Sequence, residues 1–198
     1  MQCQKGWKLL SPSKGSSSIK FTESLEMPQK CRFNFERHPK HIIVCEKSEE
    51  RRTFVKDHYP DVIVTTPEEC TASTGAYGAP LGGEDVVIEV AGSEDSFQLA
   101  WQSARPNATV SVVALYDRPQ ILPLPDMYDK NLTFKTGGVD GCDCAEILSL
   151  IEQGLIDTTP LITHRYSMED IEEAYRVFEN REPGVIKVAI DCLCLKSN

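Results

Sequence analysis

Short apolar runs alternate with amphipathic segments along the chain from His41 onward. The runs are rich in β-branched residues, which is typical of buried strands. In chain order they are 41–45, 61–64, 85–90, 109–115, 132–134 and 184–190. Most are separated by segments with a helical period, and strands separated by helices predict a parallel sheet that helices cover. The fold class is therefore α/β.

The predicted helices begin at residues whose side chains can accept a hydrogen bond from a free backbone N–H. Ser48, Ser93 and Ser167 precede three of them, and Asp143 opens another. After Ser93, Asp143 and Ser167, apolar residues recur at helical spacing. In chain order these are Phe97, Ala100, Trp101 and Ala104; Ile147, Leu150 and Ile151; and Ile171, Ala174, Tyr175 and Phe178. Such stripes are typical of helices that pack against a core.

The amino-terminal region 1–40 has a different character. It contains the linker-like stretch "SPSKGSSS" and a polar segment with two prolines, in which Cys31, Phe33 and Phe35 alternate with polar residues. We expect this region to be poorly ordered or loosely docked. The predicted organisation is an unmatched segment 1–40, a domain 41–190 and a tail 191–198.

An acid, Glu46, ends the strand "HIIVC" and is followed by a serine-capped helix. In a dinucleotide-binding fold such an acid holds the adenosine ribose, and a glycine-rich phosphate loop lies about twenty residues upstream. No glycine occurs between Lys20 and His41. The later stretch "GAYGAPLGG" is no substitute, because it precedes a strand instead of opening a helix. We therefore predict an incomplete, Rossmann-type doubly wound sheet that lacks its first strand and its glycine-rich loop, with a gap at its centre unless "CRFNF" or another segment fills it.

Charge and cysteine usage narrow the classes of partner. The 198 residues carry a net charge of −9 with a pI of about 5.0, which argues against nucleic acid and anionic membranes as partners. No apolar run is long enough to span a bilayer, and the first residues lack the apolar core of a signal peptide. The eight cysteines do not form a disulfide pattern, and the pairs Cys142/Cys144 and Cys192/Cys194 are too closely spaced for an ordinary structural zinc site. A reduced, cytoplasmic protein is expected.

Three segments carry a resemblance to a known family: "DVVIEVAGSEDSFQLAWQSARPNATVSVVALY", "LPLPDMYDKNLTFKTGG" and "PLITHRYSMEDIEEAYRVFENREPGVIKVAI". They resemble the carboxyl-terminal part of the cofactor-binding domain of the zinc-dependent medium-chain alcohol/polyol dehydrogenases, most of all the branch with sorbitol, threonine and butanediol dehydrogenases. The resemblance covers about residues 40–190, is poor over 71–83 and is lacking over 1–39.

The resemblance implies a set of residues that contact NAD. They are Glu46, Arg51, Val90, Ala91, Gly92, Ala114, Leu115, Thr136, Gly137 and Lys187. Glu46 would accept the ribose hydroxyls and repel a 2′-phosphate, which favours NAD over NADP. Arg51 would lie beside the adenosine, and Lys187 near the pyrophosphate.

Each of these roles has a simpler alternative. Glu46 could be a solvated loop acid, and Arg51 could only pair with Glu46 or Glu50 on a helix surface. Lys187 could point outward as any lysine of a half-exposed strand does. His164 is expected to form structural hydrogen bonds and not to act as an acid or base.

The resemblance also implies what this chain does. In the family a zinc ion polarises the oxygen of the substrate, and its ligands belong to an amino-terminal domain that has no match here. We therefore expect a fragment of a zinc- and NAD-dependent alcohol/polyol dehydrogenase that is inactive alone and binds NAD weakly. The alternatives are a non-catalytic nucleotide-binding or dimerisation module, or one piece of a split dehydrogenase. A homodimer through the edge Ile121–Leu124 is expected from the resemblance.

Overall fold

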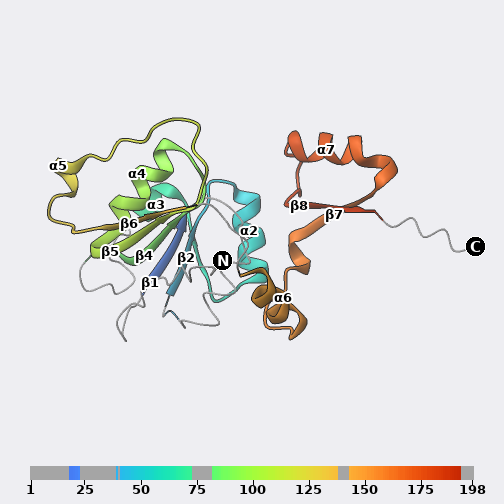
Figure 1. Cartoon of the computed structure of the whole chain (residues 1–198), viewed down its shortest axis with the longest axis horizontal. Helices are drawn as coiled ribbons and strands as arrows, with labels where there is room; N and C mark the ends of the chain where they lie inside the picture. Colours follow the sequence, from blue (N-terminus) through green and yellow to red (C-terminus); the bar gives the residue numbers. More distant parts are fainter. Residues whose placement is uncertain (1–17, 23–38, 40, 73–81, 138–142, 193–198) are drawn as a thin grey trace, which may run out of the picture.

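The computed structural model describes residues 18–22, 39, 41–72, 82–137 and 143–192. Within them the main element is a six-stranded, fully parallel sheet in the order β3-β2-β1-β4-β5-β6 (Figure 1). The strands are β1 Ser18–Thr22, β2 His41–Cys45, β3 Ile63–Thr65, β4 Glu84–Glu89, β5 Ala104–Val112 and β6 Thr133–Thr136. This is the strand order of a doubly wound, Rossmann-type sheet, so the predicted fold class is confirmed.

One part of the prediction is wrong: the first strand is present. β1 lies between β2 and β4 and pairs in parallel with both, with Ile19 opposite Ile42 on one side and Val86 on the other. Without β1, the facing edges of β2 and β4 would bury unpaired backbone amides at the centre of the sheet. The sheet thus includes a segment of the region 1–40. The alternative filler "CRFNF" lies outside the described residues.

Helices cover both faces of this sheet. They are α2 Glu49–His58, α3 Pro67–Ala72, α4 Glu94–Ser103 and α5 Leu124–Met127. On one face, Val55 of α2 packs with the outward side chains of β2 and β4, including Ile42, Val86 and Ile88. On the other face, Ala100 of α4 packs with Val87 and Val110. Every residue of β4 is buried, as expected for a strand with a neighbour on each edge and a helix on each face.

The predicted helix faces agree with the structure in α4. The four residues of the predicted stripe, Phe97, Ala100, Trp101 and Ala104, are all buried, although Ala104 is already the first residue of β5. Ser93 caps the helix and forms a reciprocal capping box with Ser96. Ser48 likewise caps α2 by accepting a hydrogen bond from the backbone N–H of Arg51.

The carboxyl-terminal part forms a separate unit, with α6 Cys144–Glu152, η1 Thr159–Leu161, β7 Ile162–Ser167, η2 Met168–Asp170, α7 Ile171–Glu179 and β8 Lys187–Asp191. The strand predicted over 184–190 does not join the main sheet, because β8 pairs with β7 in a two-stranded parallel sheet (Figure 1). Leu161 and Ile186 attach this unit to the core on the β2 and α2 face of the main sheet. In α7, Ala174 is buried, whereas Tyr175 and Phe178 are exposed.

Among the described residues, no helix combines the length and the apolar character that crossing a bilayer requires.

Candidate functional site

All strands of the main sheet are parallel, so their carboxyl ends meet at one edge. The chain order reverses between β1 and β4, and in open α/β sheets ligands bind outside the carboxyl ends of the strands at such a switch point. The predicted residues follow these ends: Glu46 follows β2, Val90 follows β4, Ala114 follows β5 and Gly137 follows β6. The fold therefore brings most of the predicted site to one edge.

Glu46 is held at the carboxyl end of β2. Its side chain is buried, and Oε1 accepts a hydrogen bond of 2.9 Å from the backbone N–H of Ser48. Its own backbone N–H donates to the carbonyl of Thr65, which ties it to β3. The alternative of a solvated loop acid does not fit this burial.

Arg51 lies on the first turns of α2, close to this acid. Its Nη1 is 4.0 Å from Oε2 of Glu46, and its side chain is partly exposed. The structure thus shows the ion pair that was the simpler alternative for Arg51, and this pair holds a cation beside the predicted ribose site.

The turn after β4 is tightly packed against the end of β5. Gly92 has a positive φ of 76°, and a Cβ on it would lie 2.5 Å from the carbonyl oxygen of Leu115. The backbone N–H groups of Val113 and Ala114 both donate to the carbonyl of Glu89, at 2.9 and 3.3 Å. Val90, Ala91, Gly92, Ala114 and Leu115 are therefore brought together, and only glycine fits at position 92.

The carboxyl end of β6 lies at the same edge of the sheet. Thr136 lies opposite Val112 of β5 and is exposed, as is Gly137 after it. The side chain of Leu115 is also exposed, at 94% of its surface. At these positions the backbone and small side chains line the edge.

Lys187 is placed differently. It is the first residue of β8, in the two-stranded sheet, and its side chain is exposed. Its neighbour Ile186 packs against the same core cluster as Val90 and Val113, so β8 begins close to the main sheet. The exposed lysine between two partly buried residues fits the alternation of a half-exposed strand.

Two polar residues at this edge, Glu89 and Ser96, are not among the predicted site residues. Glu89, the last residue of β4, is completely buried, and one of its carboxylate oxygens accepts a hydrogen bond from the hydroxyl of Ser96. A signal was available: an acid that interrupts the apolar run "DVVIEV" must find donors when the strand is buried.

The described residues offer no metal centre. They contain no group of three or more His, Cys, Asp or Glu side chains that could hold a metal ion. Cys144 and Cys192 are exposed, and the other member of each pair, Cys142 and Cys194, lies outside the described residues. His164 is half-buried, with Nδ1 3.0 Å from the hydroxyl of Thr163, as expected for a structural role.

Comparisons with known proteins agree with this fold. No protein-family profile matches the chain. An alcohol dehydrogenase of Cupriavidus necator is 30% identical over 114 residues, which is 54% of this chain and 31% of that protein. An L-arabinitol 4-dehydrogenase of Penicillium rubens is 26% identical over 164 residues, which is 75% of this chain and 42% of that protein. The chain thus spans less than half the length of these two curated relatives.

Solved structures show the same fold. A zinc-dependent alcohol dehydrogenase 2 from Streptococcus pneumonia matches with a TM-score of 0.78 and 20% identity, over 90% of this chain and 53% of that one. Two others, an alcohol dehydrogenase from E. coli complexed with NADH and a zinc-binding dehydrogenase from Sinorhizobium meliloti bound to NADP, match with TM-scores of 0.73 and 0.72 at 18% identity. The match with the first covers 89% of this chain and 52% of the E. coli chain. The match with the second covers 89% of this chain and 53% of the Sinorhizobium meliloti chain. The predicted resemblance is confirmed: this chain is similar to zinc-dependent alcohol, polyol and threonine dehydrogenases.

Proposed function

We propose that this chain is the dinucleotide-binding part of a zinc- and NAD-dependent alcohol or polyol dehydrogenase. The observation that carries the proposal is the buried acid Glu46 at the end of β2, next to the switch point of a parallel 3-2-1-4-5-6 sheet. The relatives support the class of activity, since they are named as alcohol and polyol dehydrogenases.

A dinucleotide that crosses the switch point has one half over β2 and the other over β4, β5 and β6. In the proposed arrangement, Glu46 accepts the hydroxyls of the adenosine ribose, and Arg51 beside it supports the adenosine half. The turn 90–92 and the strand ends at Ala114, Leu115, Thr136 and Gly137 face the nicotinamide half. The nicotinamide, when bound, would accept the hydride from the alcohol carbon.

Glu46 decides between the two nicotinamide cofactors in this proposal. Solved relatives of the same fold hold NADH in one case and NADP in another, so the fold itself does not choose. A buried carboxylate at the ribose repels the 2′-phosphate of NADP, which favours NAD.

We expect weak binding and no turnover from the 198-residue chain alone. No glycine lies between Thr22, the end of β1, and His41, the start of β2. A pyrophosphate there lacks the close backbone approach that glycine permits. The described residues contain no group of three or more His, Cys, Asp or Glu side chains that could hold a zinc ion beside the alcohol. Cys45 and Cys70 are buried cysteines of the core, which suits the proposed cytoplasmic location.

Titration calorimetry with NAD and NADP tests this proposal. Glu46→Gln keeps an oxygen for the N–H of Ser48 but removes the charge, and we expect it to weaken NAD binding roughly tenfold and to abolish the preference over NADP. Glu49→Gln, an exposed acid three residues away, is the matched control and should change neither. NAD binding at low micromolar Kd that survives Glu46→Gln would contradict the proposal.

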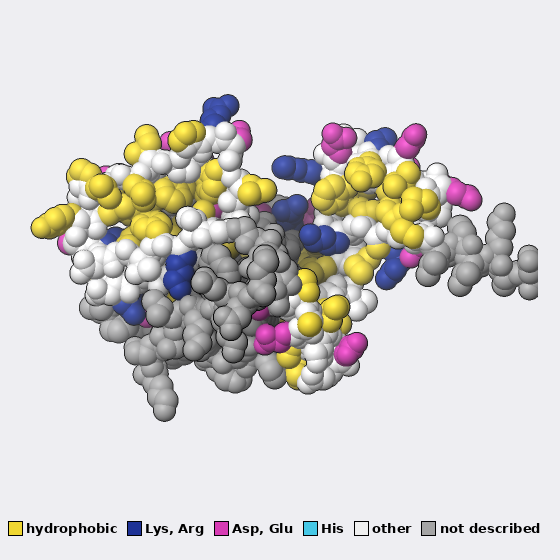
Figure 2. Space-filling model, viewed as in Figure 1, with side chains coloured by type: hydrophobic (Ala, Val, Ile, Leu, Met, Phe, Trp, Pro, Cys, Tyr) yellow, Lys and Arg dark blue, Asp and Glu magenta, His cyan; other side chains and the backbone are white. Residues whose placement is uncertain are grey.

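A second candidate function, as a dimerisation module, is favoured by exposed apolar residues. They gather on the segment that includes α5, where hydrophobic side chains cover much of the visible face (Figure 2). The members are Leu115, Ile121, Leu122, Leu124 and Tyr128. A patch of this kind marks an interaction site, and we propose that a second copy of the chain pairs at the edge Ile121–Leu124. In a split dehydrogenase, the remaining alternative, a second polypeptide would bind the chain.

Light scattering coupled to size exclusion tests the dimer. We expect the wild type to elute at twice the mass of the chain and Ile121→Asp at the monomer mass. Leu148→Asp is the matched control, because Leu148 is an exposed leucine on α6, 60% accessible, away from this edge. A wild-type monomer with a sharp thermal transition would refute the assignment.

A further inference from the structure

Glu89 is an unusual residue for the centre of a sheet. It is completely buried, and its backbone lies between Thr22 of β1 and Val112 of β5. Among the described residues no lysine or arginine forms an ion pair with it. A buried acid without a cation needs hydrogen-bond donors, because the desolvation of a carboxylate is otherwise too unfavourable.

The donors all come from the segment that follows β4. Oε1 of Glu89 accepts hydrogen bonds from the backbone N–H groups of Ala91 and Gly92, at 2.8 and 3.0 Å, and from the hydroxyl of Ser96, at 2.8 Å. Ser96 also belongs to the capping box of α4 with Ser93. One carboxylate oxygen thus fixes the turn 90–92 and the first turn of α4.

The same residue holds the end of β5. Its carbonyl accepts the N–H groups of Val113 and Ala114, and the turn that it fixes packs Gly92 against the carbonyl of Leu115. Side chain and backbone of Glu89 therefore connect the two segments that we assign to the nicotinamide half.

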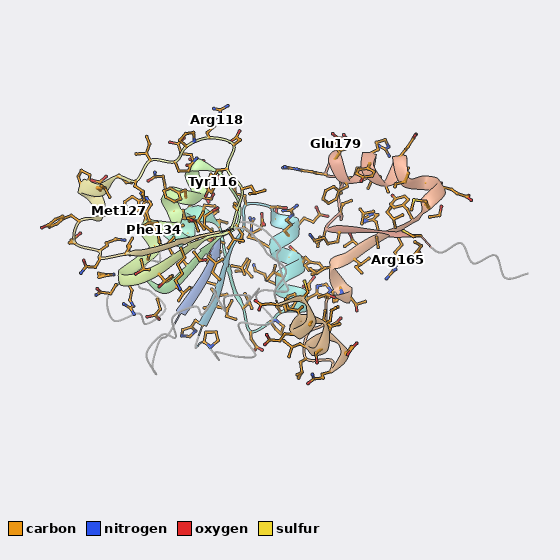
Figure 3. The ribbon with its side chains drawn as sticks, in the orientation of Figure 1. Tyr116, Arg118, Met127, Phe134, Arg165 and Glu179 are labelled. Carbon is orange, nitrogen blue, oxygen red and sulfur yellow. The ribbon has the colours of Figure 1, made fainter. Side chains whose placement is uncertain are left out.

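We pair the other carboxylate oxygen of Glu89 with the hydroxyl of Tyr116. Oε2 of Glu89 is buried and forms no hydrogen bond with the described residues, and the same holds for the hydroxyl of Tyr116. Burial, and after it the neighbouring carboxylate of Glu89, raise the pKa of Tyr116, so its hydroxyl stays protonated and remains a donor. The ring of Tyr116 is held edge-on against Phe97 of α4, with the centroids 6.2 Å apart. Figure 3 shows it on the side of the sheet that α4 covers, together with Met127 and Phe134.

We propose that Glu89 is the positioning residue of the nucleotide site, and that Tyr116 restrains its second oxygen. Glu89 does not touch the nucleotide. It keeps the turn 90–92 and the strand end 113–115 at the spacing that the nicotinamide half requires. This inference rests on the proposed nucleotide binding.

The test must separate the two halves of the ligand, because binding is expected to be weak. Saturation-transfer NMR with millimolar NAD reports adenine and nicotinamide protons separately. We expect transfer to both in the wild type. Glu89→Ala should lower the ratio of nicotinamide to adenine transfer by about threefold or more, since small displacements of a positioned group have large effects, while adenine transfer persists.

Three further variants test the positioning role of Glu89. Glu89→Gln keeps one acceptor oxygen for the turn and should restore much of the nicotinamide transfer. Glu84→Ala removes a buried acid from the opposite, amino end of the same strand and should leave the ratio unchanged. Tyr116→Phe keeps every donor of the turn and should lower the ratio about twofold. This variant tests the positioning role if Glu89→Ala does not fold.

The outcomes are distinguishable. An unchanged ratio in both Glu89→Ala and Tyr116→Phe would overturn the positioning role and leave the proposed function intact. Equal loss of adenine and nicotinamide transfer in a folded Glu89→Ala would also overturn it, since the residue would then only support the fold. Absence of transfer to any NAD proton in the wild type would refute the proposed function and this inference with it.

Discussion

Strands β4 and β8 have similar sequences, "EDVVIE" and "KVAID", but different surroundings. All six residues of β4 are buried, whereas no residue of β8 is fully buried. β4 has β1 and β5 on its edges, with a helix over each face. Among the described strands β8 pairs with β7 alone, and it packs against α7. The comparison shows that the apolar content of a strand does not set its burial; the number of neighbouring elements does.

The helices of the two regions differ in the same way. α4 buries each apolar residue of its predicted stripe, while α7 leaves Tyr175 and Phe178 exposed at 69% and 52%. The stabilising free energy of burial is proportional to the apolar area removed from water. We therefore expect most of the stability of the described structure to come from the six-stranded sheet.

The largest expected effect is a cavity at the centre of that sheet. Ile43 of β2 is 1% exposed, and Ile43→Ala should lower the free energy of unfolding by about 2–5 kcal/mol. Ile190→Ala in the partly buried β8 should lower it by less than about 1 kcal/mol. Urea denaturation followed by far-UV circular dichroism measures both changes in the free energy of unfolding. Equal losses in the two variants would contradict the difference in burial between the main sheet and β8.

A smaller difference is expected between two ion pairs. Arg105 contacts the buried carboxylate of Asp85 through Nε and Nη2, both at 2.6 Å, on β5 and β4. Arg105→Ala should destabilise the protein by about 3 kcal/mol, because it leaves a buried charge uncompensated. Arg176 of α7 pairs with the exposed Glu173, and Arg176→Ala should leave the urea midpoint unchanged. A large shift of that midpoint would show that α7 is less solvated than the structure has it.

The smallest expected effect is a pH dependence confined to α7. The hydrogen bond from Arg176 lowers the pKa of Glu173 below its ordinary value of 4.5. A carboxyl whose folded pKa is depressed adds stability above its unfolded pKa, and this stability is lost as the pH falls below about 4.5. Nuclear magnetic resonance of the Glu173 carboxyl between pH 6 and 3 should show the low pKa in the wild type and a rise in Arg176→Ala. Identical titration in both proteins would rule the pairing out.

Sequence reasoning found the elements whose pattern is local and missed those set by distant neighbours. The runs 41–45 and 85–90 and the face of α4 follow from periodicity alone. β1 is only five residues long and follows a linker-like stretch, and it becomes recognisable only through the open edges of β2 and β4. β7 was missed because its polar residues alternate on a half-exposed surface.

The same distinction holds for the site. Glu46 could be proposed as a ribose ligand because an acid after a strand has a known meaning in this fold. Glu89 could not be assigned a role in advance, because its hydrogen bonds to Ala91, Gly92 and Ser96 depend on the geometry of the turn.

The central position of β1 also has a consequence for biosynthesis. On the ribosome, β1 and β2 emerge early, but the second neighbour of β1 is complete only when Glu89 has been made. Until then β1 has an open edge, which is a site for wrong pairing with other chains. The strand order that places the proposed ligand site at the middle of the sheet therefore makes that middle a late, long-range step of folding.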